Sequence, residues 1–242
     1  MIYLYGRHAV LSALDNPKRY LGKLILSKSF GDADNLQKKH PRLKTEFVSQ
    51  DDFIHKFGKD AVHQGIALET EPLPAPPLER IIEQHQDSTA SLIILLDQVT
   101  DPHNVGAITR SAAAFGAHGI VMPKHQSAPL DSAILAKTAC GGVEHIPLLT
   151  VTNFAHSMKQ LKKGGYWCIG LDERGEQPID KAPLTGKIAL ILGAEGKGLR
   201  RLTKDNCDLL TNLPTNPAFP TLNVSNAAAL SFYEYNRQNK AP

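Results

Sequence analysis

A polar cluster follows an apolar run near the middle of the chain. The run SLIILLD, residues 91–97, leads into DPHNVGAITR, residues 101–110, where Asn104 and Arg110 stand among small and apolar residues. Asn104 fits a helix start, because Asn side chains cap free backbone N–H groups there. Arg110 has no such explanation, and its guanidinium offers several fixed donors to an anion or to developing negative charge. The stretch therefore predicts part of a site. We interpret His103 as a solvated loop residue, with contact to substrate as the alternative.

A glycine-rich turn forms the second candidate. LILGAEGKGLRRLT, residues 190–203, reads as a strand, a turn and a helix start, with glycines at 193, 196 and 198. This spacing matches neither the dinucleotide pattern nor the phosphate loop, because Lys197 is followed by Gly198. Glu195 in the turn would repel a pyrophosphate, so the loop suits a neutral or cationic ligand on bare backbone. A purely structural turn remains the alternative.

The third candidate is a crowded helix start. TLNVSNAAALSFYE, residues 221–234, places Asn223, Ser225 and Asn226 where one capping residue would serve. The segment before it, LPTNPAFPTL, is rich in proline and therefore rigid and irregular. The surplus polar residues indicate that some of them face a ligand or substrate.

Other kinds of chemistry find little support. The ten histidines lack metal-ligand spacing, so no metal is expected, and no Ser-His-Asp or Cys-His order stands out. The three cysteines, Cys140, Cys168 and Cys207, form no pair and favour a reducing cytoplasm. No apolar run approaches the roughly 18 residues of a membrane span, and the N-terminus lacks signal-peptide features.

A proline-rich segment, EPLPAPP at residues 71–77, marks the sharpest change in composition. Its prolines favour extended backbone, so we predict a domain of residues 1–70, a linker and connecting helix at 71–88, and a second domain of residues 89–242. The first domain alternates predicted helices (6–14, 33–40 and 50–57) with strands (22–27, 45–49 and 64–70), as in a small α/β sandwich.

The second domain alternates in the same way. Its predicted helices are 78–86, a helix from Asn104, 132–139, 153–165, 208–214 and a helix from about Ser225, and its strands are 91–97, 119–123, 146–151, 166–172 and 187–193. Continuous apolar strands between helices predict a parallel sheet covered on both faces.

Charge is unevenly distributed along the chain. Residues 1–70 hold 11 Lys and Arg against 8 Asp and Glu, residues 71–88 hold 1 against 4, and residues 89–242 hold 15 against 12. Two mildly basic bodies joined by an acidic connector are compatible with a polyanionic partner, and an ordinary solvated surface explains the charge equally well.

Taken together, the three motifs are similar to those of the SpoU (TrmH) family of RNA ribose 2′-O-methyltransferases in the SPOUT superfamily. DPHNVGAITRSAAAFGAHGIV, LILGAEGKGLR and LNVSNAAALSFYE match in order and separation, and YGRHAV and HQGIAL extend the likeness to the first domain. The resemblance implies an α/β fold with a parallel-sheet SPOUT domain and a deep trefoil knot, preceded by a small RNA-binding domain like a ribosomal protein. It also implies a homodimer with a composite site.

The resemblance also implies residue roles. By motif position, Gly193, Leu213, Leu222, Ser225 and Asn226 would contact S-adenosylmethionine. The catalytic set would be Asn104, Arg110, Glu195, Asn223 and Ser225.

The implied activity is methylation of a ribose 2′-hydroxyl in RNA, most closely that of a guanosine in bacterial 23S rRNA. A tRNA guanosine methyltransferase of the same superfamily is the alternative within the class, although those enzymes usually lack the first domain. A catalytically silent RNA-binding protein is the alternative from another class, and the presence of Asn104 and Arg110 speaks against it.

Overall fold

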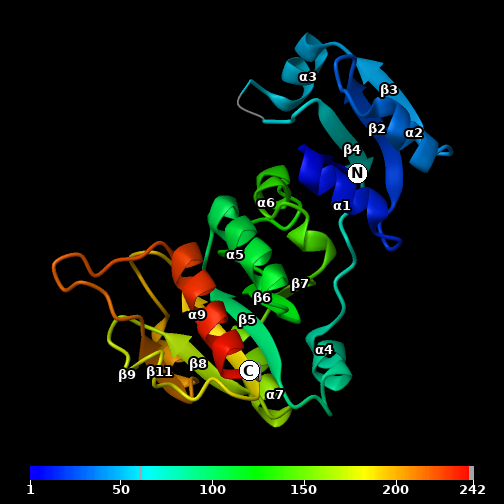
Figure 1. Ribbon diagram of the computed structural model, residues 1–242. Coiled ribbons are helices and arrows are strands. Elements are labelled where there is room, and N and C mark those ends of the chain that lie inside the picture. Colours follow the sequence, from blue (N-terminus) through cyan, green and yellow to red (C-terminus); the bar gives the residue numbers. More distant parts are fainter. Residues whose placement is uncertain (60–61, 240–242) are drawn as a thin grey trace.

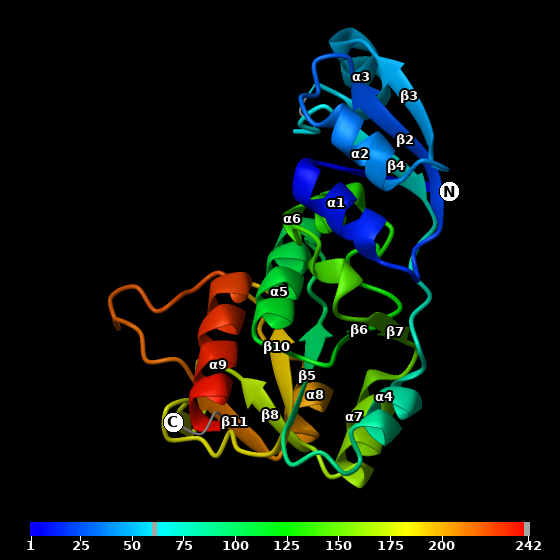
Figure 2. The same cartoon turned by 45° about the vertical axis from the view of Figure 1, so that its right-hand side comes forward.

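The computed structural model describes residues 1–59 and 62–239, so residues 60–61 of the first predicted domain and 240–242 of the last lie outside the described residues. The described chain forms a four-stranded sheet and a seven-stranded sheet, each with its own helices (Figure 1). Residues 71–77 connect the two parts without forming a helix or a strand (Figure 2). The domain boundaries drawn from this segment stay a prediction.

The four-stranded part confirms the predicted alternation and adds a first strand. Its elements are β1 (Ile2–Tyr5), α1 (Arg7–Asp15), β2 (Leu21–Ser27), α2 (Ala33–Lys39), β3 (Lys44–Val48), α3 (Gln50–Phe57) and β4 (Ile66–Thr70). The strand order is β1-β4-β2-β3, with β4 antiparallel to both neighbours and β2 parallel to β3. Leu4, Val10 and Leu24 lie in a core between the sheet and its helices.

The seven-stranded part is parallel throughout, as its apolar strands predict. Its elements are α4 (Leu78–Gln84), β5 (Ser91–Asp97), α5 (Pro102–Ala114), β6 (Gly119–Pro123), α6 (Ala133–Thr138), the 3-10 helix η1 (Gly142–Glu144), β7 (Leu148–Val151), α7 (Phe154–Lys163), β8 (Trp167–Leu171), β9 (Gln177–Pro178), β10 (Lys187–Gly193), α8 (Arg201–Asp205), β11 (Leu209–Asn212) and α9 (Val224–Asn239). The strand order is β7-β6-β5-β10-β8-β11-β9. Every residue of β5 is buried, because helices cover both faces of the sheet.

Two hydrophobic clusters sandwich this sheet. On one face, Ile108 of α5 and Phe232 of α9 pack against β5 and β10. On the other face, Ile81 of α4 and Phe154 and Met158 of α7 do the same. The helix predicted at residues 153–165 therefore buries one apolar face, and Asn153 caps it by accepting a hydrogen bond from the His156 N–H.

Two local predictions were wrong. Residues 209–212 form strand β11 rather than part of a helix, because parallel pairing with β8 and β9 buries Thr211, whose hydroxyl donates to the Gln177 carbonyl at 2.8 Å. Helix α5 begins at Pro102 rather than Asn104, with the Asp101 side chain capping it by accepting from the His103 N–H at 2.9 Å. Asn104 is thus inside the helix, and its amide is available for other contacts.

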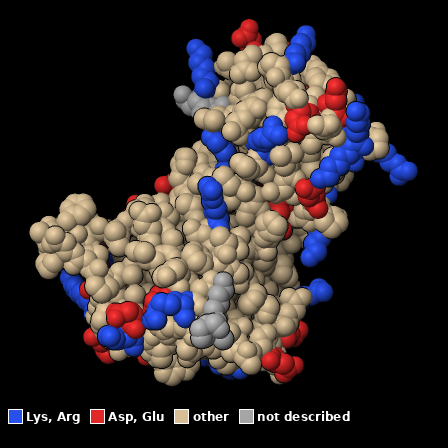
Figure 3. All heavy atoms as spheres, viewed as in Figure 1, with Lys and Arg blue, Asp and Glu red and all other residues tan. Residues whose placement is uncertain are grey.

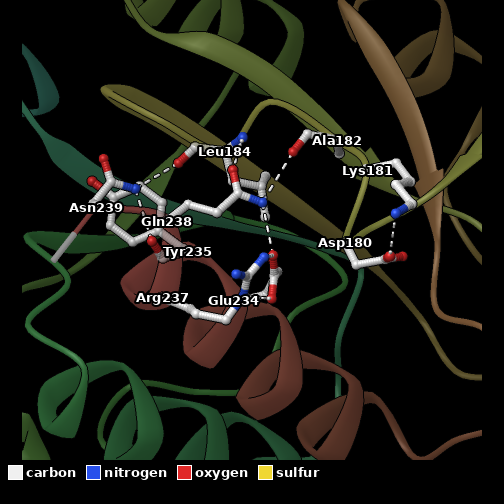
Figure 4. Close-up of polar contacts among 9 residues, drawn as sticks. All are labelled: Asp180, Lys181, Ala182, Leu184, Glu234, Tyr235, Arg237, Gln238 and Asn239. Atoms are coloured by element: carbon white, nitrogen blue, oxygen red, sulfur yellow. Dashed lines mark hydrogen bonds and ion pairs between the residues drawn. The ribbon is translucent and has the colours of Figure 1, made fainter. Parts of the chain in front are cut away.

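The final helix is fixed at its far end by the segment before β10. Gln238 accepts a hydrogen bond from the Leu184 N–H and donates to the Ala182 carbonyl, and Asn239 donates to the Leu184 carbonyl (Figure 4). These contacts hold α9 against the sheet, so that its first turn is placed at the opposite, carboxyl edge of the strands. Among the described residues, no helix has the length and apolar character needed to cross a membrane.

Candidate active site

The first two motifs leave the sheet side by side. β5 and β10 are neighbours in parallel pairing, and their last residues, Asp97 and Gly193, are register partners. Because loops that follow adjacent parallel strands meet at one edge of the sheet, the segments after Asp97 and Gly193 share that edge. This arrangement is what brings residues about a hundred positions apart into one place.

Asn223 joins all three motifs. Its amide nitrogen donates to Asn104 Oδ1 at 2.9 Å and to Glu195 Oε1 at 2.6 Å. Its oxygen accepts from the Ser225 N–H at 2.9 Å and from the Ser225 hydroxyl at 2.5 Å. Four of the five residues predicted as catalytic thus form one hydrogen-bonded cluster, which we call the asparagine cluster: Asn104, Glu195, Asn223 and Ser225.

The asparagine cluster remains open to solvent. Glu195 and Asn223 are exposed, and Asn104 and Ser225 are half-buried. The Glu195 carboxylate is also oriented by the Val224 N–H at 3.4 Å, at the start of α9. An exposed yet mutually bonded set of polar side chains is organised to meet a further polar group, such as a ribose hydroxyl.

Arg110 lies away from this cluster. It is six residues beyond Asn104 on α5, a rise of about 9 Å along the helix. Among the described residues, the only hydrogen-bond partner of its side chain is Cys140, whose Sγ accepts from Nη1 at 3.4 Å. Its side chain is exposed, so within one chain the guanidinium faces solvent rather than the asparagine cluster.

The glycine-rich turn folds back on itself. Ala194 and Gly198 form an isolated bridge, with the Gly198 N–H donating to the Ala194 carbonyl at 2.8 Å. A Cβ placed on Gly193 would lie 2.2 Å from the backbone carbon of Gly198. Gly193 is therefore required by the turn's own packing, because any side chain there would overlap the backbone of Gly198.

Asp97 supports this turn and was not among the predicted site residues. Its side chain is fully buried and accepts from Arg200 Nε at 2.6 Å and from the Arg200 N–H at 3.0 Å. The Arg200 guanidinium also lies 5.6 Å from the ring centre of Phe154. A carboxylate ending an otherwise apolar strand was the sequence signal that could have identified it, because buried charges need a partner.

The residues predicted to hold the cofactor lie around the same edge. Leu213 and Leu222 belong to the loop between β11 and α9, and Leu222 is 42% exposed. Asn226 is exposed on the first turn of α9. Partly exposed apolar side chains beside a bare glycine turn fit a flat, largely apolar ring system, and the Glu195 carboxylate suits a cation such as a sulfonium. The residues present therefore fit S-adenosylmethionine.

Comparison with known proteins identifies the motifs. Residues 91–233 match the family model described as the SpoU rRNA methylase family. The chain belongs to this family. Residues 3–76 match the model for RNA 2′-O ribose methyltransferase substrate binding, so the four-stranded part is the substrate-binding domain of an RNA 2′-O-ribose methyltransferase.

Proteins similar to this chain match it over different lengths. The 23S rRNA (guanosine-2′-O-)-methyltransferase RlmB of Vibrio vulnificus is 38% identical over 99% of this chain and 98% of its own. The SpoU methyltransferase AviRb from Streptomyces viridochromogenes, solved with AdoMet, superposes with a TM-score of 0.82 over 98% of this chain and 89% of its own, at 22% identity. A TrmH/SpoU tRNA modifying enzyme of A. aeolicus covers 66% of this chain and 83% of its own, with a TM-score of 0.55 at 23% identity.

These findings confirm the resemblance and the α/β fold with a parallel sheet. The trefoil knot stays a prediction, because strand order and pairing do not report how the chain is threaded. In the described part of the chain, no group of three or more His, Cys, Asp or Glu side chains is arranged to hold a metal ion.

Proposed function

We propose that this SpoU enzyme methylates the 2′-hydroxyl of a guanosine in 23S rRNA and takes the methyl group from S-adenosylmethionine. The observation that carries the proposal is the asparagine cluster, in which Asn223 bonds to Asn104 and Glu195 and so joins three motif segments at one sheet edge. The name of the Vibrio relative, which matches over both chains' lengths, supports the substrate.

The asparagine cluster has a definite task in this reaction. S-adenosylmethionine supplies an electrophilic methyl group on a sulfonium, and the ribose oxygen must be aligned with it and lose its proton. Asn104 and Asn223 position the ribose hydroxyl, while Glu195 and the partly exposed leucines of the loop hold the cationic donor. Gly193, Leu213, Leu222, Ser225 and Asn226 form the cofactor-binding set in this proposal.

Arg110 acts through its positive charge and geometry. A guanidinium is effectively always protonated in proteins, so it holds a phosphate or stabilises the developing alkoxide rather than accepting the proton. Because it points away from the asparagine cluster of its own chain, we place it in the composite site of a homodimer, where it faces the partner's cluster.

The surface of α9 supports the dimer. Leu230 is 50% exposed and Tyr233 is 59% exposed. The Tyr233 and Phe115 rings pack edge to face, with their centres 6.5 Å apart. The first part of α9 and the loop before it carry few charged side chains on the face in view (Figure 3). Exposed apolar side chains with few charged neighbours are typical of a surface that a second copy of the chain covers.

Light scattering tests the dimer. Leu230→Asp with Tyr233→Asp should reduce the mass from dimer to monomer and abolish methyl transfer. Leu202→Asp, at an apolar side chain that is 62% exposed on α8, is the matched control and should stay dimeric. A wild-type monomer would rule out the composite site.

The substrate-binding domain supplies RNA affinity in this proposal. Lys and Arg side chains project from it in several directions (Figure 3). Arg42→Glu with Lys44→Glu, at the exposed start of edge strand β3, should weaken binding of 23S rRNA fragments and reduce its salt dependence. Lys159→Glu with Lys163→Glu on α7 makes the same charge change elsewhere. Equal weakening by both pairs would show nonspecific attraction only.

The activity itself is tested with radiolabelled S-adenosylmethionine, 23S rRNA and tRNA. The wild-type protein should label a guanosine ribose of 23S rRNA, and Glu195→Gln should reduce labelling by about tenfold or more, as expected for one lost charged contact. Glu173→Gln, at an exposed carboxylate after β8, is the control. Labelling of tRNA alone would favour the tRNA alternative, and binding without labelling would favour a silent RNA-binding protein.

Methylation takes place in the cytoplasm in this proposal, in keeping with three free cysteines.

A further inference from the structure

The two domains share a hydrophobic core at α6. Ala136 of α6 belongs to the core of the substrate-binding domain, together with Leu4, Val10 and Ala13. The adjacent Leu135 belongs to the core of the methyltransferase domain. Helices α1 and α6 lie side by side in both ribbon views (Figures 1 and 2). Helix α6 therefore packs against both domains.

A buried ion pair lies beside this contact. Arg19 Nη2 is 2.5 Å from Glu144 Oε1, and the two side chains are only 4% and 2% exposed. Asn16 donates to the same carboxylate at 2.8 Å, and Arg19 Nη1 donates to the Glu71 carbonyl at 2.7 Å. Glu144 ends η1, so the substrate-binding domain holds η1 in place.

Residues 140–142 run from the turn after α6 into the first residue of η1, and they lie close to both domains. A Cβ on Gly141 would lie 2.2 Å from Ser12 Oγ of α1, so no side chain fits between them. A Cβ on Gly142 would lie 3.2 Å from the Cα of Arg110. Cys140 itself has a positive φ of 49°, a conformation that non-glycine residues rarely adopt.

The Arg110 side chain forms a hydrogen bond with this segment. Cys140 Sγ accepts from Arg110 Nη1 at 3.4 Å. The contacts therefore run without a gap from α1 through Cys140–Gly142 to the guanidinium. A displacement of α1 would therefore shift residues 140–142 and the Arg110 side chain, because a close-packed interior has no free space to absorb it.

We infer that Cys140 is a positioning residue for Arg110, and that docking of the substrate-binding domain on Cys140–Gly142 sets the orientation of the arginine. RNA held by the first domain thereby meets a guanidinium already placed for methyl transfer. This inference rests on the proposed function, in which Arg110 acts in the reaction.

Two substitutions of Cys140 test the positioning role. Cys140→Ala removes the acceptor and should slow single-turnover methyl transfer at saturating RNA by about threefold to tenfold, the size of one hydrogen bond. Cys140→Ser keeps an acceptor and should recover most of that loss. Both retain a Cβ, so the backbone at positive φ is equally strained in each. The Kd for S-adenosylmethionine and the thermal midpoint should match between the two variants. Equal rates for Cys140→Ala and wild type would overturn the inference.

A wedge in α1 tests the role of docking. Arg19→Ala would leave Glu144 buried without its partner and risks unfolding, so Ser12→Leu is preferred. The larger side chain should push α1 away from Gly141 and slow methyl transfer at saturating RNA by about threefold or more, the scale expected for a weakened hydrogen bond at Arg110. Asp15→Leu is the matched control on the same helix, because the Asp15 side chain is 57% exposed and its carboxylate pairs with the exposed Lys39 at 2.5 Å.

A double-mutant cycle separates coupling from general damage. In an Arg110→Ala background, Ser12→Leu and Cys140→Ala should cause no further loss of rate, because the residue through which they act is gone. A further loss equal to that in the wild-type background would refute coupling through Arg110.

A failure of the proposed function would be recognised separately. If wild type labels neither 23S rRNA nor tRNA, the proposed function fails, and NMR of the Arg110 Nε–H group, assigned with Arg110→Lys, decides the inference. That signal should move in Cys140→Ala and Ser12→Leu but not in Asp15→Leu. An unmoved signal in all three variants would overturn the coupling.

Discussion

At the amino edge of the seven-stranded sheet, the Ser91 hydroxyl bonds to Tyr166 at 2.7 Å and to His118 Nδ1 at 2.9 Å, and both Ser91 and Tyr166 are 1% exposed. At the carboxyl edge, Asn223 bonds to Asn104 and Glu195 at similar distances, yet the asparagine cluster is open to solvent. The same kinds of bonds therefore serve two purposes. The sealed network satisfies the hydrogen bonds of buried polar groups, whereas the open network leaves exposed polar atoms that a substrate can contact.

The largest expected effect lies at the carboxyl edge. Arg110→Ala and Arg110→Lys should each reduce single-turnover methyl transfer by at least about a hundredfold, the scale of one preorganised donor. A lysine ammonium does not reproduce the planar set of donors. Calorimetry should show nearly unchanged affinity for S-adenosylmethionine, and light scattering should show unchanged mass.

Arg201→Ala is the control for this prediction, because that side chain is 96% exposed on α8. It should keep the wild-type rate. Near-normal turnover by Arg110→Lys would show that a point charge suffices.

The second effect concerns the support beneath the open edge. Asp97→Ala should lower the free energy of unfolding by about 2 kcal/mol, because the Arg200 N–H loses its acceptor while the guanidinium still reaches water. The glycine-rich turn should also lose its fixed position, so cofactor affinity should fall with stability. Urea unfolding and calorimetry measure both. Asp205→Ala, at a carboxylate that is 62% exposed, should change neither quantity. Lost stability with intact cofactor affinity would show that the turn holds its shape without Asp97.

The sheet and part of its carboxyl edge could be predicted from the sequence, whereas the polar network at the amino edge was not. Continuous apolar strands indicated the parallel sheet, and the resemblance of the three motifs to those of the SpoU family implied Asn104, Glu195 and Asn223 as one site. Strand β11 was missed because a four-residue strand has no period of its own, and pairing with β8 and β9 decides its conformation. Asp97 was missed because its partner Arg200 is 103 residues away, and only the fold brings them together.

A third effect belongs to the sealed amino edge. Tyr166→Phe should lower the free energy of unfolding by about 1 kcal/mol, because the Ser91 hydroxyl loses one buried partner. Methyl transfer should not change, because the network lies at the opposite end of the strands. Tyr20→Phe, at a side chain that is 53% exposed, is the matched control for denaturant unfolding. A loss of activity in Tyr166→Phe at full stability would show that the two edges are coupled.

The smallest effect is the pH dependence of the sealed edge. His85 stacks on His118 with ring centres 3.7 Å apart, and burial lowers the pKa of both histidines. Lys187 lowers the pKa of His85 further, and His85 does the same for His118. At a pH where these two histidines are already protonated in the unfolded chain, they remain neutral in the folded chain. Stability should therefore fall as the pH drops below about 6.5.

Thermal unfolding at pH 7 and pH 5 measures this dependence, which should amount to less than about 1 kcal/mol, because His85 keeps contact with water. His85→Gln should reduce the dependence, because it removes one titrating ring and the charge that opposes protonation of His118. His125→Gln, at an exposed histidine after β6, should leave it unchanged. An identical pH dependence in His85→Gln and wild type would show that other groups govern acid stability. The amino edge would then be a network that is sealed but does not respond to pH.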